Sequence, residues 1–340
     1  MPVQEQVTFN PRSPKQVLEY LKSQGIRLPD SSEATLEVHK DRHPLIASLL
    51  ELRTLVKLNG TLTGYRKWID KDSLIHPSYG VEGTETGRCN CYDPNNQNVD
   101  PAMRGIFTSR FEGGKLISPD CSALEYREIA HASEDPILLK IFRDGKDIHK
   151  MAAVMLTGLP EDQITSELRR ENKTTNYAAC YGCGKDRFYG MLGREDEALF
   201  YKAKNMYPGV NLFKRKIEAQ LGHTGTISNI FGRIRHFSGE IDYSTLLEGF
   251  NWLFQSAGHS ILKAMVIRWY RTIIENDALD MVKLAQEGHD SCLLDTHPSC
   301  IQDVADMIKN TNLNQVIEED LGVKMLVPML IDVKVLDSWK

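Results

Sequence analysis

The sequence predicts an α+β fold, in which long helices and a few short strands occupy different stretches of the chain. Apolar residues recur at helical spacing over residues 13–25, 44–58 and 245–275. Short apolar strands are predicted at 115–120, near 281–284 and at 292–294, and the last two are close enough in sequence to form a hairpin. With 340 residues and a 41% hydrophobic share, the chain can bury a substantial core, either as one multi-lobed unit or as two domains.

Charge and hydropathy limit the class of protein. The formal net charge of -5 argues against a general nucleic-acid coat protein, although acidic metal sites and local basic patches can coexist in an enzyme that releases its substrate. The sequence contains no run of about 18 apolar residues, and its N-terminus lacks the charged-then-apolar pattern of a signal peptide. We therefore expect a soluble, globular, cytoplasmic protein.

The seven cysteines are odd in number and irregularly spaced, which is typical of a reducing compartment. Cys89 with Cys91, and Cys180 with Cys183, would supply the four thiolates of a zinc site. However, the second pair falls on a predicted helix, and the first pair has a poor spacing for metal binding. Buried free thiols are the favoured interpretation.

Two amphipathic helices are predicted near the N-terminus. Ser13 is the expected N-cap of the first, over residues 13–25. The second, over residues 44–58, is expected to end before Gly60. Its core-facing side chains are predicted to be Leu45, Leu49, Leu52, Leu55 and Val56.

Residues 165–184 read TSELRRENKTTNYAACYGCG and predict another helix. Thr165 or Ser166 can cap its N-terminus by accepting backbone N–H bonds, and Glu167 in the first turn is favoured by the helix dipole.

Arg169, Lys173, Tyr177 and Tyr181 follow one another at steps of four on this helix and share one side of it. At about 1.5 Å per residue, these four side chains extend over roughly 18 Å, comparable to an extended nucleoside triphosphate. The cations would hold phosphates, and the rings would hold a sugar and base. For a single R-x-x-x-K pattern a solvated basic helix is the favoured alternative, but the complete string is much rarer.

The string R-x-x-x-K-x-x-N-Y-x-x-x-Y-G resembles the fingers helix of family A (Pol I-like) DNA polymerases, and further strings follow in the family's order from about Phe9 to Trp339. The resemblance implies a right-hand polymerase fold with an antiparallel-sheet palm, helical fingers and a short helical thumb. It implies a thumb over 1–65, palm over 66–130 and 241–340, and fingers over 131–240. The implied activity is template-directed extension of a DNA primer with dNTPs, in DNA replication or repair.

The same resemblance assigns the metal ligands. In D-x-S-x-x-E-x-R, Asp120 resembles the first catalytic aspartate, with the backbone carbonyl of Cys121 beside it. In E-G-H-D-S, Asp290 resembles the second, although Ser291 replaces the usual glutamate. Two carboxylates at strand ends are the minimum shared ligands for two Mg²⁺ ions about 4 Å apart, one of them carried by the dNTP.

Resemblance also implies the dNTP contacts. Glu125 would lie under the sugar and exclude a 2′-hydroxyl, with Tyr181 as its hydrogen-bond partner. His149, in G-K-D-I-H, joins Arg169 and Lys173 as a triphosphate donor, and Lys173 would protonate the pyrophosphate. Tyr177 occupies a position where the family carries Phe or Tyr.

The candidate DNA contacts come from several stretches. In F-G-R-I-R, at a predicted turn over residues 231–235, Arg233 and Arg235 would contact the template or phosphates, and a solvated turn is the alternative. Residues 84–98 predict an irregular loop, and its T-G-R and D-P-N-x-Q-N strings resemble the segment beside the primer–template minor groove. The string N-x-x-x-Q-S-A-G on the helix over 245–275 resembles phage-type members. The candidate DNA-binding residues are Arg88, Gln97, Arg233, Arg235, Asn251, Gln255 and His289.

Two alternatives stay open. A single-subunit RNA polymerase is disfavoured because Glu125 resembles the ribose-excluding residue. A non-catalytic DNA-binding or assembly subunit is favoured only by Ser291 and by the apparent lack of an N-terminal region. In the family these lobes follow a 3′–5′ exonuclease domain, for which there is no room before residue 9. We therefore expect no proofreading by this chain alone, and either a separate exonuclease or N-terminal subunit as partner or an abbreviated thumb.

Overall fold

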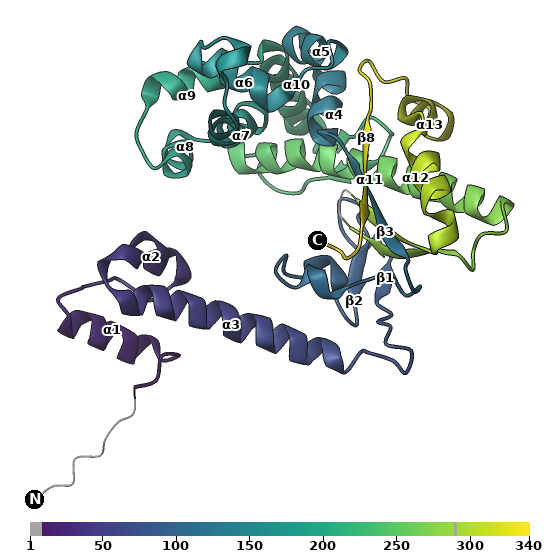
Figure 1. Cartoon of the computed structure of the whole chain (residues 1–340). Helices are drawn as coiled ribbons and strands as arrows, with labels where there is room; N and C mark the ends of the chain where they lie inside the picture. The colour runs from purple at the N-terminus through teal and green to yellow at the C-terminus, as the bar shows by residue number, and fades with distance from the viewer. Residues whose placement is uncertain (1–8, 289–290) are drawn as a thin grey trace, which may run out of the picture. The chain divides into compact units, whose positions relative to one another are not determined.

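The structure, a computed structural model, describes residues 9–288 and 291–340 and consists of two compact units, residues 1–76 and 77–340. The smaller unit contains helices α1 (Pro14–Ser23), α2 (Glu33–Val38) and α3 (Pro44–Arg66), with the 3-10 turn η1 (Lys40–Arg42) (Figure 1). The division into thumb, palm and fingers stays a prediction.

The smaller unit has its own core. Ser13 caps α1, as predicted, because its hydroxyl accepts a hydrogen bond from the backbone N–H of Gln16. The buried apolar side chains are Val17, Leu21, Ile26, Leu36, Ile46 and Leu49. They come from all three helices and from the turn after α1, so each helix is held by the same small cluster.

Helix α3 is longer than the sequence predicted. It continues through Gly60 and ends at Arg66, and Leu55, which we expected to face the core, is exposed. A glycine inside a helix costs about 1 kcal/mol relative to alanine, so it weakens a helix without necessarily ending it. Burial of Tyr65 in the last turn helps to offset that cost.

A four-stranded antiparallel sheet forms the centre of the larger unit (Figure 1). Its strands, in spatial order, are β6 (Val282–Glu287), β7 (Cys292–Thr296), β3 (Lys115–Cys121) and β8 (Ile331–Leu336). Two small ladders accompany it: β1 (Ser78–Gly80) with β2 (Asn90–Tyr92), and β4 (Thr226–Ser228) with β5 (Ile234–His236).

The helices of the larger unit are, in chain order, α4 (Leu124–Ser133), α5 (Pro136–Arg143), α6 (Ile148–Thr157), α7 (Ser166–Tyr181), α8 (Lys185–Leu192), α9 (Glu197–Lys204), α10 (Pro208–Thr224), α11 (Tyr243–Glu275), α12 (Ile301–Lys309) and α13 (Leu313–Leu321). Helix α12 packs against β3 and β8 of the four-stranded sheet, and α5 to α10 form a helical group apart from it (Figure 1). The 3-10 turns of this unit are η2 (Asn96–Asn98), η3 (Arg104–Ile106), η4 (Glu161–Gln163) and η5 (Pro298–Cys300).

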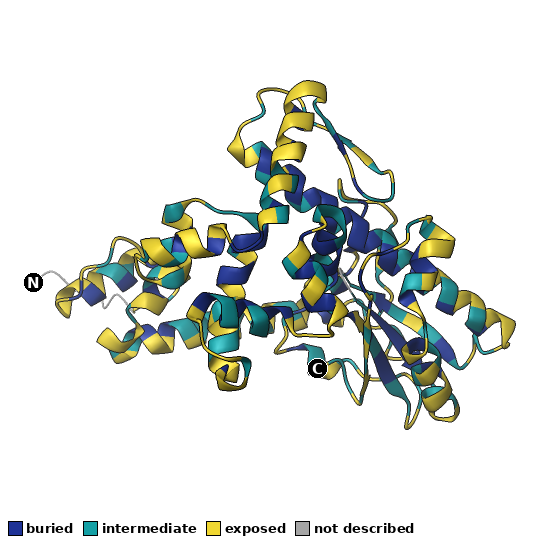
Figure 2. Cartoon of the chain, turned by 90° about the horizontal axis from the view of Figure 1, so that it is seen from above, coloured by how far each residue is buried: buried dark blue, intermediate teal, exposed yellow. Residues whose placement is uncertain are grey.

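Helix α11 packs against several other helices of the larger unit. Asp242 caps it, and it confirms the helix predicted over 245–275 with a start two residues earlier. It contacts α4, α7, α10 and α13, and residues such as Phe250, Trp252 and Ile261 are buried. Figure 2 draws the buried residues of the chain in dark blue. A helix apolar on most of its circumference is expected where helices pack on several sides.

The predicted strands are confirmed, and β6 and β7 pair from Val282–Thr296 to Glu287–Cys292 as the two sides of the expected hairpin. His289 and Asp290, which we placed at its tip, lie outside the described residues. Thr165 caps α7. That helix ends at Tyr181, so the prediction that Cys183 lies on it is wrong. Of the four cysteines expected to be buried, Cys91 and Cys180 are buried, whereas Cys89 and Cys183 are only partly buried.

None of the helices within the described ranges is both long enough and apolar enough to cross a lipid bilayer.

Candidate functional site

The central strand of the sheet ends at a carboxylate. Asp120 is the residue before last in β3 and is exposed. On one side its cross-strand partner is Asp332 of β8, and on the other it forms an isolated bridge with Ser291. Residues directly opposite each other in an antiparallel pair project to the same face of the sheet. Asp332 and Ser291 therefore flank the side chain of Asp120.

Asp120 and Asp332 line a cavity of about 490 Å³, and α7 contributes to its wall. Arg169, Lys173 and Tyr177 of α7 line the same cavity. The structure thus places Arg169 and Lys173 of α7 and the predicted metal ligand Asp120 around a single polar cavity.

The two cations of α7 differ in their present contacts. Arg169 donates through Nε (3.0 Å) and Nη2 (2.7 Å) to one carboxylate oxygen of Asp147, the N-cap of α6. Both side chains are 41% exposed, so this ion pair contributes little to stability and can exchange for another anion. Lys173 is exposed and forms no ion pair with any other residue that the structure describes.

His149 lies in the first turn of α6, where the sequence had placed it just before a helix, and it lines the same cavity. Burial, and secondly the charge of Arg169, lower its pKa to about 4, so the ring is neutral near pH 7. Asn176 accepts a hydrogen bond from Tyr207 through Oδ1 (2.7 Å), which directs its amide N–H to His149 Nδ1 (3.2 Å). This assigns the ring proton of His149 to Nε2.

The aromatic end of α7 is joined to α4. Tyr181 donates a hydrogen bond to a carboxylate oxygen of Glu125, which confirms the contact predicted between them. Burial and the charge of Glu125 raise the pKa of Tyr181, so its hydroxyl stays protonated. The rings of Tyr177 and Tyr181 stack with centroids 6.0 Å apart. Together they form an apolar surface next to a carboxylate.

A second cavity, of about 450 Å³, adjoins this aromatic pair. It is lined by Glu125, Tyr177 and Tyr181, and from α11 by Asn251 and Gln255. The two α11 amides that the sequence singled out therefore face the same space as the α7 rings.

The prediction that residues 84–98 form an irregular loop is wrong in part, because this segment contains β2 and the turn η2. The segment is attached to the four-stranded sheet and to α11. Gln97 donates through Nε2 to the backbone carbonyl (3.2 Å) and the carboxylate (3.1 Å) of Glu287. Lys263 of α11 donates to the carbonyl of Gly87 (3.1 Å). Gly87 has φ of +75°, and a side chain there would collide with the guanidinium of Arg233. The positive φ favours glycine at this turn, whereas a larger side chain would only require the flexible end of Arg233 to shift.

Arg233 and Arg235 do not line either cavity next to α7. Arg233 pairs with Glu82 at 3.2 Å, and Arg235 pairs with Glu85 and Glu248. Their guanidinium groups are engaged in ion pairs along the β4–β5 hairpin, so contact with a phosphate requires exchange of these partners.

Nearly the whole chain, residues 3–340, matches the family model described as DNA polymerase family A. The chain belongs to DNA polymerase family A.

The chain is similar to only part of the length of longer members of the family. It is 26% identical over 359 residues to DNA polymerase I of Streptococcus pneumoniae, covering 97% of this chain and 40% of that protein. It is 28% identical over 333 residues to the thermostable DNA polymerase I of Thermus aquaticus, covering 91% of this chain and 38% of that protein. The family A chain thus spans about 40% of the length of these relatives.

A solved structure confirms the predicted fold class. The POL domain of Pol1 from M. smegmatis, in complex with DNA primer-template and dNTP, superposes with a TM-score of 0.84 at 23% sequence identity. The match covers 97% of this family A chain and 61% of that chain. The likeness shows that the two share the right-hand polymerase fold.

Polymerases of family A use divalent metal ions, and the donors at the end of β3 suit a hard cation. Asp120, Asp332 and the Cys121 carbonyl offer oxygen, which Mg²⁺ prefers over nitrogen or sulfur. Sequence reasoning missed Asp332, because its approach to Asp120 depends on the β3–β8 register, and no spacing within the sequence indicates that register.

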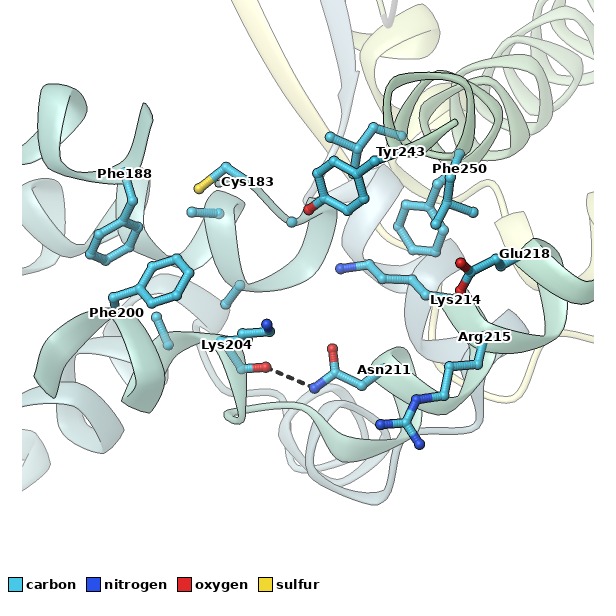
Figure 3. A pocket seen from close by; sticks show the side chains of 16 residues that line it. Cys183, Phe188, Phe200, Lys204, Asn211, Lys214, Arg215, Glu218, Tyr243 and Phe250 are labelled. Carbon is cyan, nitrogen blue, oxygen red and sulfur yellow. Dashed lines mark hydrogen bonds between the residues drawn. The ribbon is translucent and has the colours of Figure 1, made fainter. Parts of the chain in front are cut away.

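A further cavity of about 200 Å³ in this family A chain is lined by residues of α7, α8, α9, α10 and α11 (Figure 3). Phe188, Phe200 and Phe250 make it largely apolar, and Figure 3 shows Lys214 reaching into it. Burial lowers the pKa of Lys214 to about 8. Asp120 does not line this cavity, but Gly182, Cys183 and Leu247 line both it and the second cavity.

Proposed function

We propose that this chain extends a DNA primer with dNTPs under the direction of a template, as the polymerase part of a family A DNA polymerase. The observation that carries the proposal is the polar cavity in which Asp120 lies across from Arg169 and Lys173. Nucleotidyl transfer needs carboxylates for divalent cations and donors for a triphosphate within one site. The M. smegmatis structure contains primer-template DNA and dNTP, which supports the same ligands here.

The triphosphate would lie along the first half of α7. Arg169 would leave Asp147 and bind phosphate oxygens through the same two N–H groups. Lys173, which has no competing ion pair in the described chain, would neutralise phosphate charge and protonate the pyrophosphate. His149 would donate through Nε2–H as a neutral ring.

The sugar and base would lie against the second half of α7. Tyr177 offers an aromatic face that is 39% exposed. Glu125, held by Tyr181, would occupy the space that a 2′-hydroxyl needs, which favours dNTPs over rNTPs.

The metal ligands would be Asp120, the Cys121 carbonyl and Asp290, the last of which lies outside the described residues. Two Mg²⁺ ions, one carried by the dNTP, would supply Lewis-acid activation of the 3′-oxygen and neutralisation of the phosphates. Ser291 removes the third carboxylate from one side of Asp120, and Asp332 offers one on the other side.

The DNA would contact residues on four segments. Asn251 and Gln255, which line the second cavity, would contact minor-groove edges, whose acceptors are nearly the same for every correct pair. Arg88, Gln97 and His289 would lie near the primer terminus, and Arg233 and Arg235 would reach phosphates after exchange of their carboxylate partners. Seven free cysteines support a reducing, cytoplasmic location.

The test is extension of a labelled primer–template by the purified chain, with and without Mg²⁺, using dNTPs or rNTPs. We expect Mg²⁺-dependent extension with dNTPs, and a loss of at least about 10³-fold in the Asp290→Asn variant. Asp303→Asn, an exposed aspartate on α12, is the matched control.

Primer–template binding without Mg²⁺-dependent extension would instead support a non-catalytic subunit. Preferential use of rNTPs would support an RNA polymerase.

A further inference from the structure

A cysteine, a histidine and a glutamate from distant parts of the sequence meet next to the sheet. Cys89 belongs to the loop over residues 84–98, His259 to α11 and Glu287 to the last position of β6. One ligand atom of each lies within 4.8 Å of the ligand atoms of the other two. Sulfur, imidazole nitrogen and carboxylate oxygen are the donors that zinc binds in proteins.

The spacing of these donors is close to that of a tetrahedral site. His259 Nδ1 lies 3.5 Å from Glu287 Oε1. Zinc bond lengths of about 2.0 to 2.3 Å place tetrahedral ligand atoms about 3.5 Å apart. One edge of the tetrahedron therefore already has the required length, and Cys89 Sγ lies within 4.8 Å of both ligand atoms.

The surroundings hold the donors in place. The side chain of His259 is 2% exposed and that of Glu287 is 13% exposed. Gln97 Nε2 donates both to a Glu287 carboxylate oxygen (3.1 Å) and to the Cys89 carbonyl (3.2 Å). Outer hydrogen bonds of this kind fix the orientation of metal ligands.

Charge favours a cation at this place. A thiolate and a carboxylate together carry two negative charges, which a divalent cation neutralises, so the buried unit is neutral overall. Burial raises the pKa of Glu287 to about 7 and also raises the pKa of Cys89. The positive charges of Lys263 and Arg88 oppose this rise at Glu287 only in part, so metal binding has to displace protons from both groups.

We propose that Cys89, His259 and Glu287 bind a zinc ion, with water as the fourth ligand. The thiol proton passes to solvent on binding. His259 coordinates through Nδ1 and carries its ring proton on Nε2, so the long hydrogen bond from the Cys89 N–H to Nε2 (3.3 Å) is given up. The ion connects the loop over residues 84–98 to α11 and β6, and thereby fixes Arg88 and Gln97. Zinc binding here requires neither DNA nor polymerase activity.

The test uses Co²⁺ as a spectroscopic substitute for zinc on the full chain after chelator treatment. We expect one equivalent of Co²⁺ to produce a thiolate-to-cobalt charge-transfer band, which Zn²⁺ then removes. Cys89→Ser is expected to abolish the band, and His259→Gln and Glu287→Gln to weaken Co²⁺ binding by at least about tenfold. Cys183→Ser, a partly exposed free cysteine elsewhere, is the matched control and is expected to keep the band.

Absence of the band in the wild-type chain, or its persistence in Cys89→Ser, would overturn the proposal and leave a hydrogen-bonded trio without metal. Circular dichroism of each metal-free variant checks the fold. If Cys89→Ser does not fold, unchanged Co²⁺ affinity in Glu287→Gln overturns the proposal equally.

Discussion

The two clusters of candidate metal ligands in the larger unit differ in donor type and in burial. At the end of β3, Asp120 and Asp332 are exposed and offer only oxygen. Around the end of β6, Cys89, His259 and Glu287 offer sulfur, nitrogen and oxygen, and His259 is almost fully buried. The exposed oxygen donors suit an ion that arrives and leaves with a substrate, whereas the enclosed mixed donors suit an ion that stays.

Because the two clusters differ in burial, a bound metal ion would also have a different role at each of them. At Asp120 the cavity of about 490 Å³ leaves room for a phosphate to complete the coordination shell. Around His259, protein hydrogen bonds already hold the donor groups in place. A metal ion bound there would therefore stabilise the structure and would not activate a substrate.

The strongest test of this difference is the Asp120→Asn variant. We expect primer extension to fall by at least about 10³-fold, because the variant lacks a carboxylate that we propose as a shared ligand of both Mg²⁺ ions. We also expect the thiolate-to-cobalt band to stay unchanged, because Asp120 is not part of the Cys89 cluster. Extension assays and Co²⁺ titration of the same preparation measure both effects.

Loss of the cobalt band in Asp120→Asn would show that the two clusters are one coupled site. Near-normal extension would remove Asp120 from the catalytic assignment.

A second test concerns the buried histidine of the polar cavity. The pKa of His149 is about 4 in the folded chain, below its unfolded value of 6.5. Between these values the unfolded chain binds a proton that the folded chain does not, so stability falls as pH falls from about 6.5 to 4. We expect His149→Gln to reduce the loss of unfolding free energy between pH 7.5 and pH 5 by about 2 kcal/mol, measured by urea unfolding.

His236→Gln, at an exposed histidine of β5, is the control for this experiment. An unchanged pH dependence in His149→Gln would mean that His149 is protonated in the folded chain.

The smallest effect concerns the carboxylate next to Asp120. We expect Asp332→Asn to lower the extension rate and Mn²⁺ affinity by about tenfold, because Ser291 leaves Asp332 as the remaining neighbouring carboxylate. Adding Ser291→Glu to this variant is expected to restore both, since residue 291 lies on the other side of Asp120. Steady-state extension and Mn²⁺ binding by electron paramagnetic resonance provide the readouts.

The negative charge of Asp332 also stabilises the positive charge of the buried Arg127, so Asp332→Asn has a structural effect as well. A loss of activity that Ser291→Glu does not restore would assign Asp332 to that structural role.

Local signals predicted much of this molecule correctly. Thr165 as a cap, the four-residue spacing from Arg169 to Tyr181, and the strand ending at Asp120 are properties of short stretches, and the structure reproduces each of them. The Tyr181–Glu125 contact was predicted through the family resemblance and is also present.

The features that sequence reasoning missed depend on long-range pairing. Asp332 reaches Asp120 only through the register of β3 and β8, and Cys89 reaches His259 across 170 residues of chain. The length of α3 was underestimated because Gly60 is tolerated within a helix that tertiary contacts of Tyr65 support. None of these outcomes is determined by the spacing of neighbouring residues.

The hydrogen bonds of Asn176 have a consequence for motion. This fully buried side chain of α7 is bonded to His149 on α6 and to Tyr207 at the start of α10. Breaking a hydrogen bond in a dry interior costs about 1 to 3 kcal/mol, several times the thermal energy. Sliding of α7 along α6 or along the start of α10 would break these bonds, so we expect these three segments to move together when the polar cavity closes.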